Sequence, residues 1–205
     1  LSPLKFLSSR FFISVCFAIP IIFTSKSVEN ANAKANVETK NNQQLSEANY
    51  DYKKYAAIKL LHADTKKVES IKLDEYLYGV VSAEMPASFE EEALKAQAVV
   101  ARTYTIYKII NSEGKHKNAD ICDSPECCQA WISKEERLKK WEASTRETYW
   151  NKIVNAVNQT QGKIITYNGK PINAFFHSNS GGKTESPINV WGGSNYPYLQ
   201  TVTTA

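Results

Sequence analysis

Side chains that bind soft metal ions are concentrated between His116 and Cys128. One imidazole and three thiols occur there in the pattern H-x5-C-x4-C-C. Thiolates and imidazole are the usual ligands of tetrahedral structural zinc. The spacing differs from that of standard zinc fingers, the adjacent Cys127 and Cys128 are poorly placed to bind together, and three free thiols are the alternative. We predict a zinc site formed by His116, Cys122, Cys127 and Cys128, with Cys127 as its weakest member.

Short hydroxyl side chains and glycines are concentrated between His177 and Glu185, in the sequence HSNSGGKTE. Glycines let the backbone approach a ligand closely, and hydroxyls supply oriented donors and acceptors. A tight turn with a histidine in the core is the alternative. A Ser–His hydrolase is disfavoured because the sequence has no G-x-S-x-G motif. We predict a substrate-lining loop formed by His177, Ser178, Ser180, Gly181, Gly182 and Thr184.

Hydrophobic spacing predicts the elements that hold these residues. Residues 56–61 and 68–73 form two strands, and residues 163–167 and 172–177 form two more around an Asn-Gly turn. A first helix follows from apolar residues at relative positions 0, 3, 4, 7 and 8, which are Leu73, Tyr76, Leu77, Val80 and Val81.

A second helix is predicted over residues 89–110, with a capping box of Ser88 and Glu91 at its start. Its apolar face is predicted to consist of Phe89, Ala93, Ala96, Val100, Tyr104 and Tyr107. A third helix is expected over residues 150–159, whereas residues 111–149 are polar and show little periodicity.

Glu84 lies at the joint between the first two helices, in the sequence Glu-Met-Pro. Pro86 disfavours helical geometry at Met85, so the first helix should end there. A rigid joint with apolar neighbours suits an acid/base carboxyl, because burial raises its pKa. An ordinary glutamate at a helix end is the alternative, and these residues alone favour that alternative.

The composition is that of a globular domain, and an apolar run near the start of the chain indicates export. Of the 205 residues, 42% are hydrophobic and the net charge is +4, without the clustered basic face of a nucleic-acid-binding protein. The apolar run 11–24 follows Lys5 and Arg10 and precedes an Ala-Asn-Ala sequence, which is typical of a secretory signal. An uncleaved membrane anchor is slightly favoured over a cleaved signal. Both alternatives place the rest of the chain outside the cytoplasm.

These patterns predict three parts of the chain. Residues 1–33 are the signal or anchor, residues 34–54 a flexible linker, and residues 55–205 a single α+β domain of mixed helices and antiparallel strands.

Four segments of the chain follow one another in this order: Glu84-Met85-Pro86; EALKAQAVVARTY at 92–104; Cys128-Gln129-Ala130-Trp131; and FHSNSGGKTE at 176–185, followed by Val190-Trp191. Together they resemble the stage II sporulation protein D family, whose domain is shared with amidase enhancers. Each motif alone is weak, but the four in sequence are specific, and the resemblance covers roughly residues 56–205. The family domain normally extends further, so part of the fold and of the substrate groove is expected beyond residue 205.

The resemblance implies a lytic transglycosylase that is anchored at the outer face of the cytoplasmic membrane and acts during engulfment of the forespore. Its substrate would be peptidoglycan glycan strands already stripped of stem peptides by a partner cell-wall amidase, with other engulfment proteins as further partners. Glu84 matches the proposed acid/base of the family, and the products would carry 1,6-anhydromuramic ends.

Three residues of the second helix complete the predicted site. Lys95 and Arg102 are seven residues apart and share one face, from which they could orient Glu84 or bind sugar hydroxyls, and Tyr104 joins them as a substrate-binding candidate. Ion pairing with neighbouring residues is the alternative for Lys95.

Two other classes of function remain open: a catalytically silent relative that activates an amidase, and a zinc hydrolase. A carboxylate that shuttles one proton needs no metal, and zinc bound by several thiolates activates water poorly. The predicted zinc is therefore structural.

Overall fold

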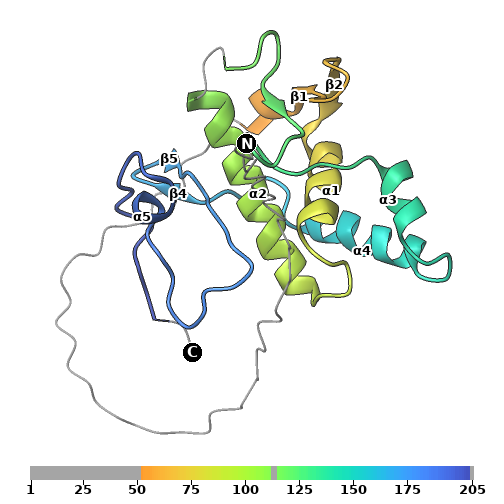
Figure 1. The fold of residues 1–205 in the computed structure, drawn as a ribbon. Coiled ribbons are helices and arrows are strands. Elements are labelled where there is room, and N and C mark those ends of the chain that lie inside the picture. Colours follow the sequence, from red (N-terminus) through yellow and green to blue (C-terminus); the bar gives the residue numbers. More distant parts are fainter. Residues whose placement is uncertain (1–51, 112–114, 204–205) are drawn as a thin grey trace, which may run out of the picture.

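A small sheet, a group of packed helices and a C-terminal segment make up the part of the chain that the structure describes (Figure 1). This computed structural model describes residues 52–111 and 115–203. The predicted signal or anchor, residues 1–33, lies outside these ranges. Within them, no helix is both long enough and apolar enough to cross a membrane. The combination of helices with mostly antiparallel strand pairs confirms the α+β class.

The sheet has the order β2-β1-β3. After a short 3-10 turn, η1 (Tyr52–Tyr55), the strands β1 (Ala57–Leu61) and β2 (Val68–Lys72) pair antiparallel, close to the predicted bounds. β3 (Ile121–Cys122), a strand that was not predicted, pairs parallel with β1. Two residues inside a polar segment carry no periodic signal, which is why this strand escaped prediction.

The helix α1 (Leu73–Glu84) agrees with its predicted pattern, since Leu73, Tyr76, Leu77, Val80 and Val81 are all buried. Asp74 and Glu75 occupy its first turn, where the helix dipole favours acids. Met85, directly before the proline, has extended backbone geometry and ends the helix.

The helix α2 (Glu91–Asn111) begins two residues after the predicted start, so the capping box does not mark its first turn. Its predicted apolar face is largely wrong, because Ala96 is exposed and Val100 only half-buried. α2 packs against both α1 and α4, which buries a different face that includes Leu94, Ala98 and Ala101. Polar side chains are also buried on this face of α2. A prediction based only on the spacing of apolar residues therefore selects the wrong face.

Two helices follow the polar segment. α3 (Lys134–Lys140) was not predicted; it buries no side chain and is stabilised at its start by Ser133, whose hydroxyl accepts from the Glu136 amide at 3.2 Å. α4 (Arg146–Gln159) begins earlier than the predicted residue 150 and buries Ile153, Ala156 and Val157 against α1 and α2.

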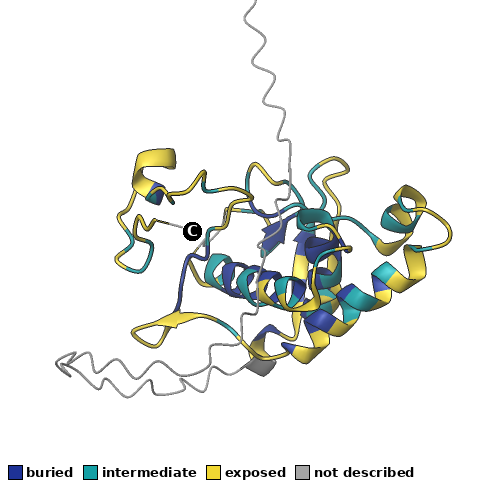
Figure 2. Ribbon diagram, turned by 90° about the horizontal axis from the view of Figure 1, so that it is seen from below, coloured by how far each residue is buried: buried dark blue, intermediate teal, exposed yellow. Residues whose placement is uncertain are grey.

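The C-terminal segment lies on the other side of α2 from α3 (Figure 1). β4 (Thr166–Tyr167) and β5 (Lys170–Pro171) form the predicted hairpin, with positive φ at both Asn168 and Gly169 as a type I′ turn requires. β4 is shorter than the predicted strand 163–167, and β5 lies before the predicted strand 172–177, none of whose residues is in a strand. A short helix, α5 (Pro187–Trp191), follows. Figure 2 shows that the chain is mostly exposed beyond Phe176, in contrast to the buried faces of α1 and α2.

Candidate functional site

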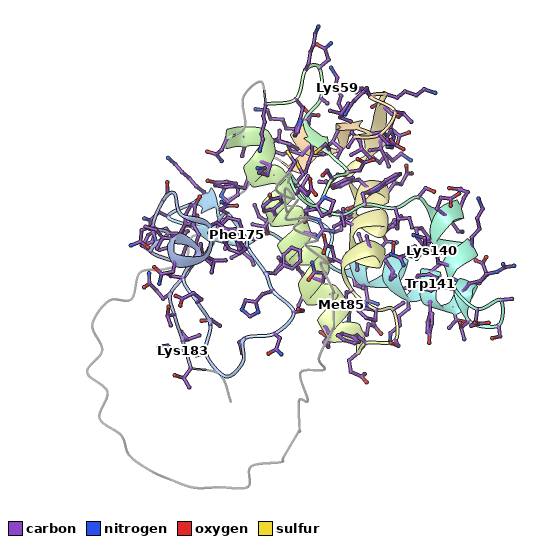
Figure 3. The ribbon with its side chains drawn as sticks, in the orientation of Figure 1. Lys59, Met85, Lys140, Trp141, Phe175 and Lys183 are labelled. Carbon is purple, nitrogen blue, oxygen red and sulfur yellow. The ribbon has the colours of Figure 1, made fainter. Side chains whose placement is uncertain are left out.

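Glu84 is the last residue of α1, at the joint that Met85 marks in Figure 3. Its carboxylate is half-buried and accepts a hydrogen bond from the backbone amide of Ala130, at 2.9 Å from Oε1. Burial raises the pKa of Glu84 above its ordinary value, and the Ala130 amide offsets part of that rise. A carboxyl with a raised pKa and one donor for its ionised form is suited both to give and to take a proton.

The segment Cys128 to Trp131 connects Glu84 with the cysteine cluster. Gln129 is buried between α1 and α2, and its Nε2 donates to the Thr105 hydroxyl at 3.0 Å. Ala130 follows directly and presents its amide to Glu84. In the sequence this segment contributes only to the family resemblance, and nothing there indicates the role of Ala130, because a backbone donor has no residue-type signature.

All four predicted metal ligands meet in the structure. Their ligand atoms lie within 4.8 Å of one another: His116 Nε2 is 3.3 Å from the Cys128 sulfur and 3.7 Å from the Cys127 sulfur, and the two sulfurs are 3.9 Å apart. A tetrahedral zinc ion with ordinary bond lengths separates such ligand atoms by about 3.5–3.8 Å. The donor set and its dimensions fit a tetrahedral metal ion.

The local fold explains how adjacent cysteines converge. The carbonyl of Ser124 accepts from the amides of both Cys127 and Cys128, at 3.2 and 2.8 Å, and this turn brings both thiols to His116. The pairing of β3 with β1 supplies Cys122. The expectation that Cys127 would be poorly placed is wrong, because the turn orients both side chains.

The surroundings of these side chains also shift their pKa values. Burial raises the pKa of the Cys128 thiol to about 12. Burial, together with Lys115 and Lys108, lowers the pKa of His116, so this imidazole is neutral at neutral pH and has a nitrogen lone pair for a metal. Metal binding to such thiols displaces their protons.

Arg102 does not line a substrate surface. Its side chain is completely buried, ion-paired with Asp74 at 3.4 Å, and donates to the Thr160 hydroxyl at 3.3 Å and the Val157 carbonyl at 3.1 Å. These contacts join α1, α2 and α4. The prediction of direct substrate contact is therefore corrected: Arg102 finds its several acceptors within the protein, because α4 covers that face of α2.

Lys95 and Tyr104 are also engaged within the protein. Lys95 forms ion pairs with Glu91 at 3.1 Å and Glu92 at 2.7 Å, as the alternative to substrate binding describes. Tyr104 is 8% exposed and packs in a small second core with Ile172 and Ala174. Burial raises the pKa of its hydroxyl. Tyr104 is therefore not available to a substrate, whereas the partly exposed Lys95 lines a pocket of about 410 Å³ and stays a prediction.

The predicted loop borders a groove of about 550 Å³ in the C-terminal segment. His177, Ser180 and Thr184 line it together with Phe175, whereas Ser178 and the two glycines do not. His177 is exposed, which rules out a core histidine, and both Gly181 and Gly182 have the positive φ that glycine favours. Glu84 is not among the lining residues, so carboxylate and groove are two separate features of the described structure.

Comparison with known proteins finds the Stage II sporulation protein family (SpoIID), whose family model matches residues 62–167. Over 147 residues the chain is 43% and 40% identical to Stage II sporulation protein D of Bacillus subtilis (strain 168) and of Bacillus amyloliquefaciens, covering 71% of this chain and 42% of each relative. An amidase enhancer of Bacillus subtilis (strain 168) is 38% identical over 123 residues, which are 60% of this chain and 14% of that protein. The family match includes Glu84 and the cysteine cluster, and the loop at 177–184 lies outside it. The resemblance found in the sequence is confirmed: the chain belongs to the Stage II sporulation protein family.

Proposed function

We propose that this protein is a lytic transglycosylase that cleaves peptide-stripped peptidoglycan glycan strands during sporulation. The observation that carries the proposal is the environment of Glu84: one half-buried carboxyl of raised pKa, with one backbone donor, the Ala130 amide, among the described residues. Most glycosidases pair two carboxylates, one as acid and one as base or nucleophile. For Glu84, burial and the Ala130 amide are the two causes of the shift, and neither is a second carboxylate.

Such a site can run both proton transfers with one group. Protonated Glu84 gives its proton to the glycosidic oxygen as the bond from that oxygen to the anomeric carbon breaks. The resulting carboxylate, which the Ala130 amide stabilises, takes the proton of the muramyl 6-hydroxyl as that oxygen bonds to the same carbon. The products are a 1,6-anhydromuramic end and a free hydroxyl, no water is consumed, and Glu84 regains its proton.

We propose further that His116, Cys122, Cys127 and Cys128 hold a structural zinc ion, supported by the convergence of their ligand atoms. When bound, the ion would cross-link β3 to the turn at residues 124–128 in a segment with few apolar side chains. The chemistry assigned to Glu84 has no step that needs it.

We extend the proposed transglycosylase function to the location of the protein and to its partners. The apolar run 11–24 would hold the protein at the outer face of the cytoplasmic membrane, where glycan strands and a peptide-removing amidase are available. The similarity to an amidase enhancer favours a second candidate function, a non-catalytic activator of a cell-wall amidase.

Digestion of peptide-free glycan strands in heavy-oxygen water, followed by mass spectrometry, tests the proposal. We expect anhydro ends that are one water lighter than hydrolytic ends and contain no heavy oxygen, and no product from Glu84→Gln. Hydrated ends labelled with heavy oxygen would indicate a hydrolase. Absence of cleavage with faster amidase turnover would establish the activator.

A further inference from the structure

Gly79 lies on α1 where the segment after the cysteine cluster crosses this helix. A Cβ atom at this position would lie 2.2 Å from Nε1 and 2.6 Å from Cδ1 of Trp131, and 2.7 Å from the carbonyl oxygen of Ile132. Real Cβ atoms essentially never approach other atoms so closely. Glycine is therefore needed here for space, so that the chain at residues 131–132 can contact α1 directly.

Gln129 fixes the same segment on the other side of Ala130. It is 2% exposed, and besides the Thr105 hydroxyl its Nε2 contacts the Tyr76 hydroxyl at 3.4 Å and the Ala101 carbonyl at 3.5 Å. The segment is thus attached both to α1, which ends in Glu84, and to α2, which follows it. Ala130 lies between these two attachments.

The indole of Trp131 gives an independent observation. Its Nε1 is buried without a hydrogen-bond partner among the described residues, an arrangement that costs stability. The ring also contacts the His62 ring, with centroids 5.5 Å apart. The protein therefore buries this indole beside Gly79 although its N–H has no partner among the described residues, and the amide of Ala130 lies one residue away.

We propose that Gly79 and Gln129 are positioning residues for Glu84, which act by holding the Ala130 amide at hydrogen-bond distance from its carboxylate. This inference rests on the proposed function, because it assigns a purpose to the amide within that reaction. Neither residue needs to touch the substrate: Gln129 is buried, and Gly79 has no side chain. Their effect reaches the substrate only through Ala130 and Glu84.

The proposal predicts a specific defect. When the amide moves away, Glu84 stays half-buried but loses the one donor that stabilises its ionised form, so the pKa of Glu84 should rise further. Glu84 is then a weaker acid, so its proton transfer to the glycosidic oxygen slows, which lowers kcat. Misplacement of a reacting group by about 1 Å costs on the order of 10²-fold in rate, whereas KM should change little because no binding contact is lost.

Two variants test it from opposite sides, Gly79→Ala and Gln129→Leu. The control is Ile153→Ala, which creates a cavity in the completely buried side of α4 and reduces stability elsewhere in the core. For each purified protein the Glu84 pKa is measured by NMR titration with carboxyl-labelled glutamate, kcat and KM with peptide-free glycan strands, and stability by denaturant unfolding.

We expect both variants, and not the control, to raise the Glu84 pKa and to lower kcat by about tenfold or more with KM within about threefold of wild type. A Glu84 titration and a kcat equal to those of the control at matched stability would overturn the proposal. If Gly79→Ala does not fold, Gln129→Leu decides. If the wild-type protein cleaves no glycan, the proposed function fails, while the NMR titration still decides whether these residues position the carboxyl.

Discussion

Replacing Glu84 by glutamine separates the chemistry of this carboxyl from its contribution to the fold. The amide oxygen of glutamine can accept the same bond from Ala130 that Oε1 accepts at 2.9 Å, so the joint should stay intact. Glutamine can neither give nor take a proton. Acid/base groups are typically worth about 10²–10⁴-fold in rate, or about 3–5 kcal/mol of activation free energy at 1.36 kcal/mol per tenfold.

The stability of the variant should depend on pH in one direction. Burial raises the pKa of Glu84 in the folded state above its unfolded value. Its contribution to stability is therefore complete below the unfolded pKa and is lost as pH rises through the folded pKa. Glutamine does not titrate, so the free energy of unfolding of Glu84→Gln should match that of wild type at low pH and equal or exceed it at neutral pH.

The measurement combines glycan cleavage at neutral pH with denaturant unfolding at several pH values, and Glu142→Gln, on an exposed residue before α4, is the matched control. We expect the control to behave like wild type in both assays. Cleavage by Glu84→Gln at more than a tenth of the wild-type rate, with a normal unfolding curve, would refute the assignment of Glu84 as acid/base.

Three further outcomes follow from the structure. Protein purified without chelator should contain one equivalent of zinc. Cys122→Ser should lose the metal, melt at a lower temperature and lose activity in parallel. Full loss of cleavage with an unchanged melting curve would instead make the metal catalytic. Ser180→Ala should weaken glycan binding by roughly 0.5–1.5 kcal/mol and Ser178→Ala by less, because only Ser180 lines the groove; equal effects on affinity would contradict this. Arg102→Met should lower the free energy of unfolding by about 1–3 kcal/mol, because Thr160, Val157 and Asp74 each lose a donor. A change in KM without a loss of stability would restore a substrate role.

The sequence by itself determined the parts of this protein that depend on local rules. The buried stripe of α1 follows from helical spacing, the end of that helix from the proline after Met85, and the hairpin from the Asn-Gly turn. The candidate metal ligands were found by residue type, because thiolates and imidazole are the usual ligands of structural zinc. The ordered motifs identified the family, because four separate segments rarely agree by chance.

Only the tertiary structure decided which faces meet. The buried face of α2 depends on what packs against it, and α4 covers Arg102, which spacing alone could equally place at a surface. Convergence of adjacent cysteines depends on a turn whose hydrogen bonds to the Ser124 carbonyl have no sequence signature. The bond from Ala130 to Glu84 joins residues 46 positions apart through a backbone amide, a group that every residue except proline carries. Residue types indicated which chemistry was available, and long-range packing determined which atoms could take part in it.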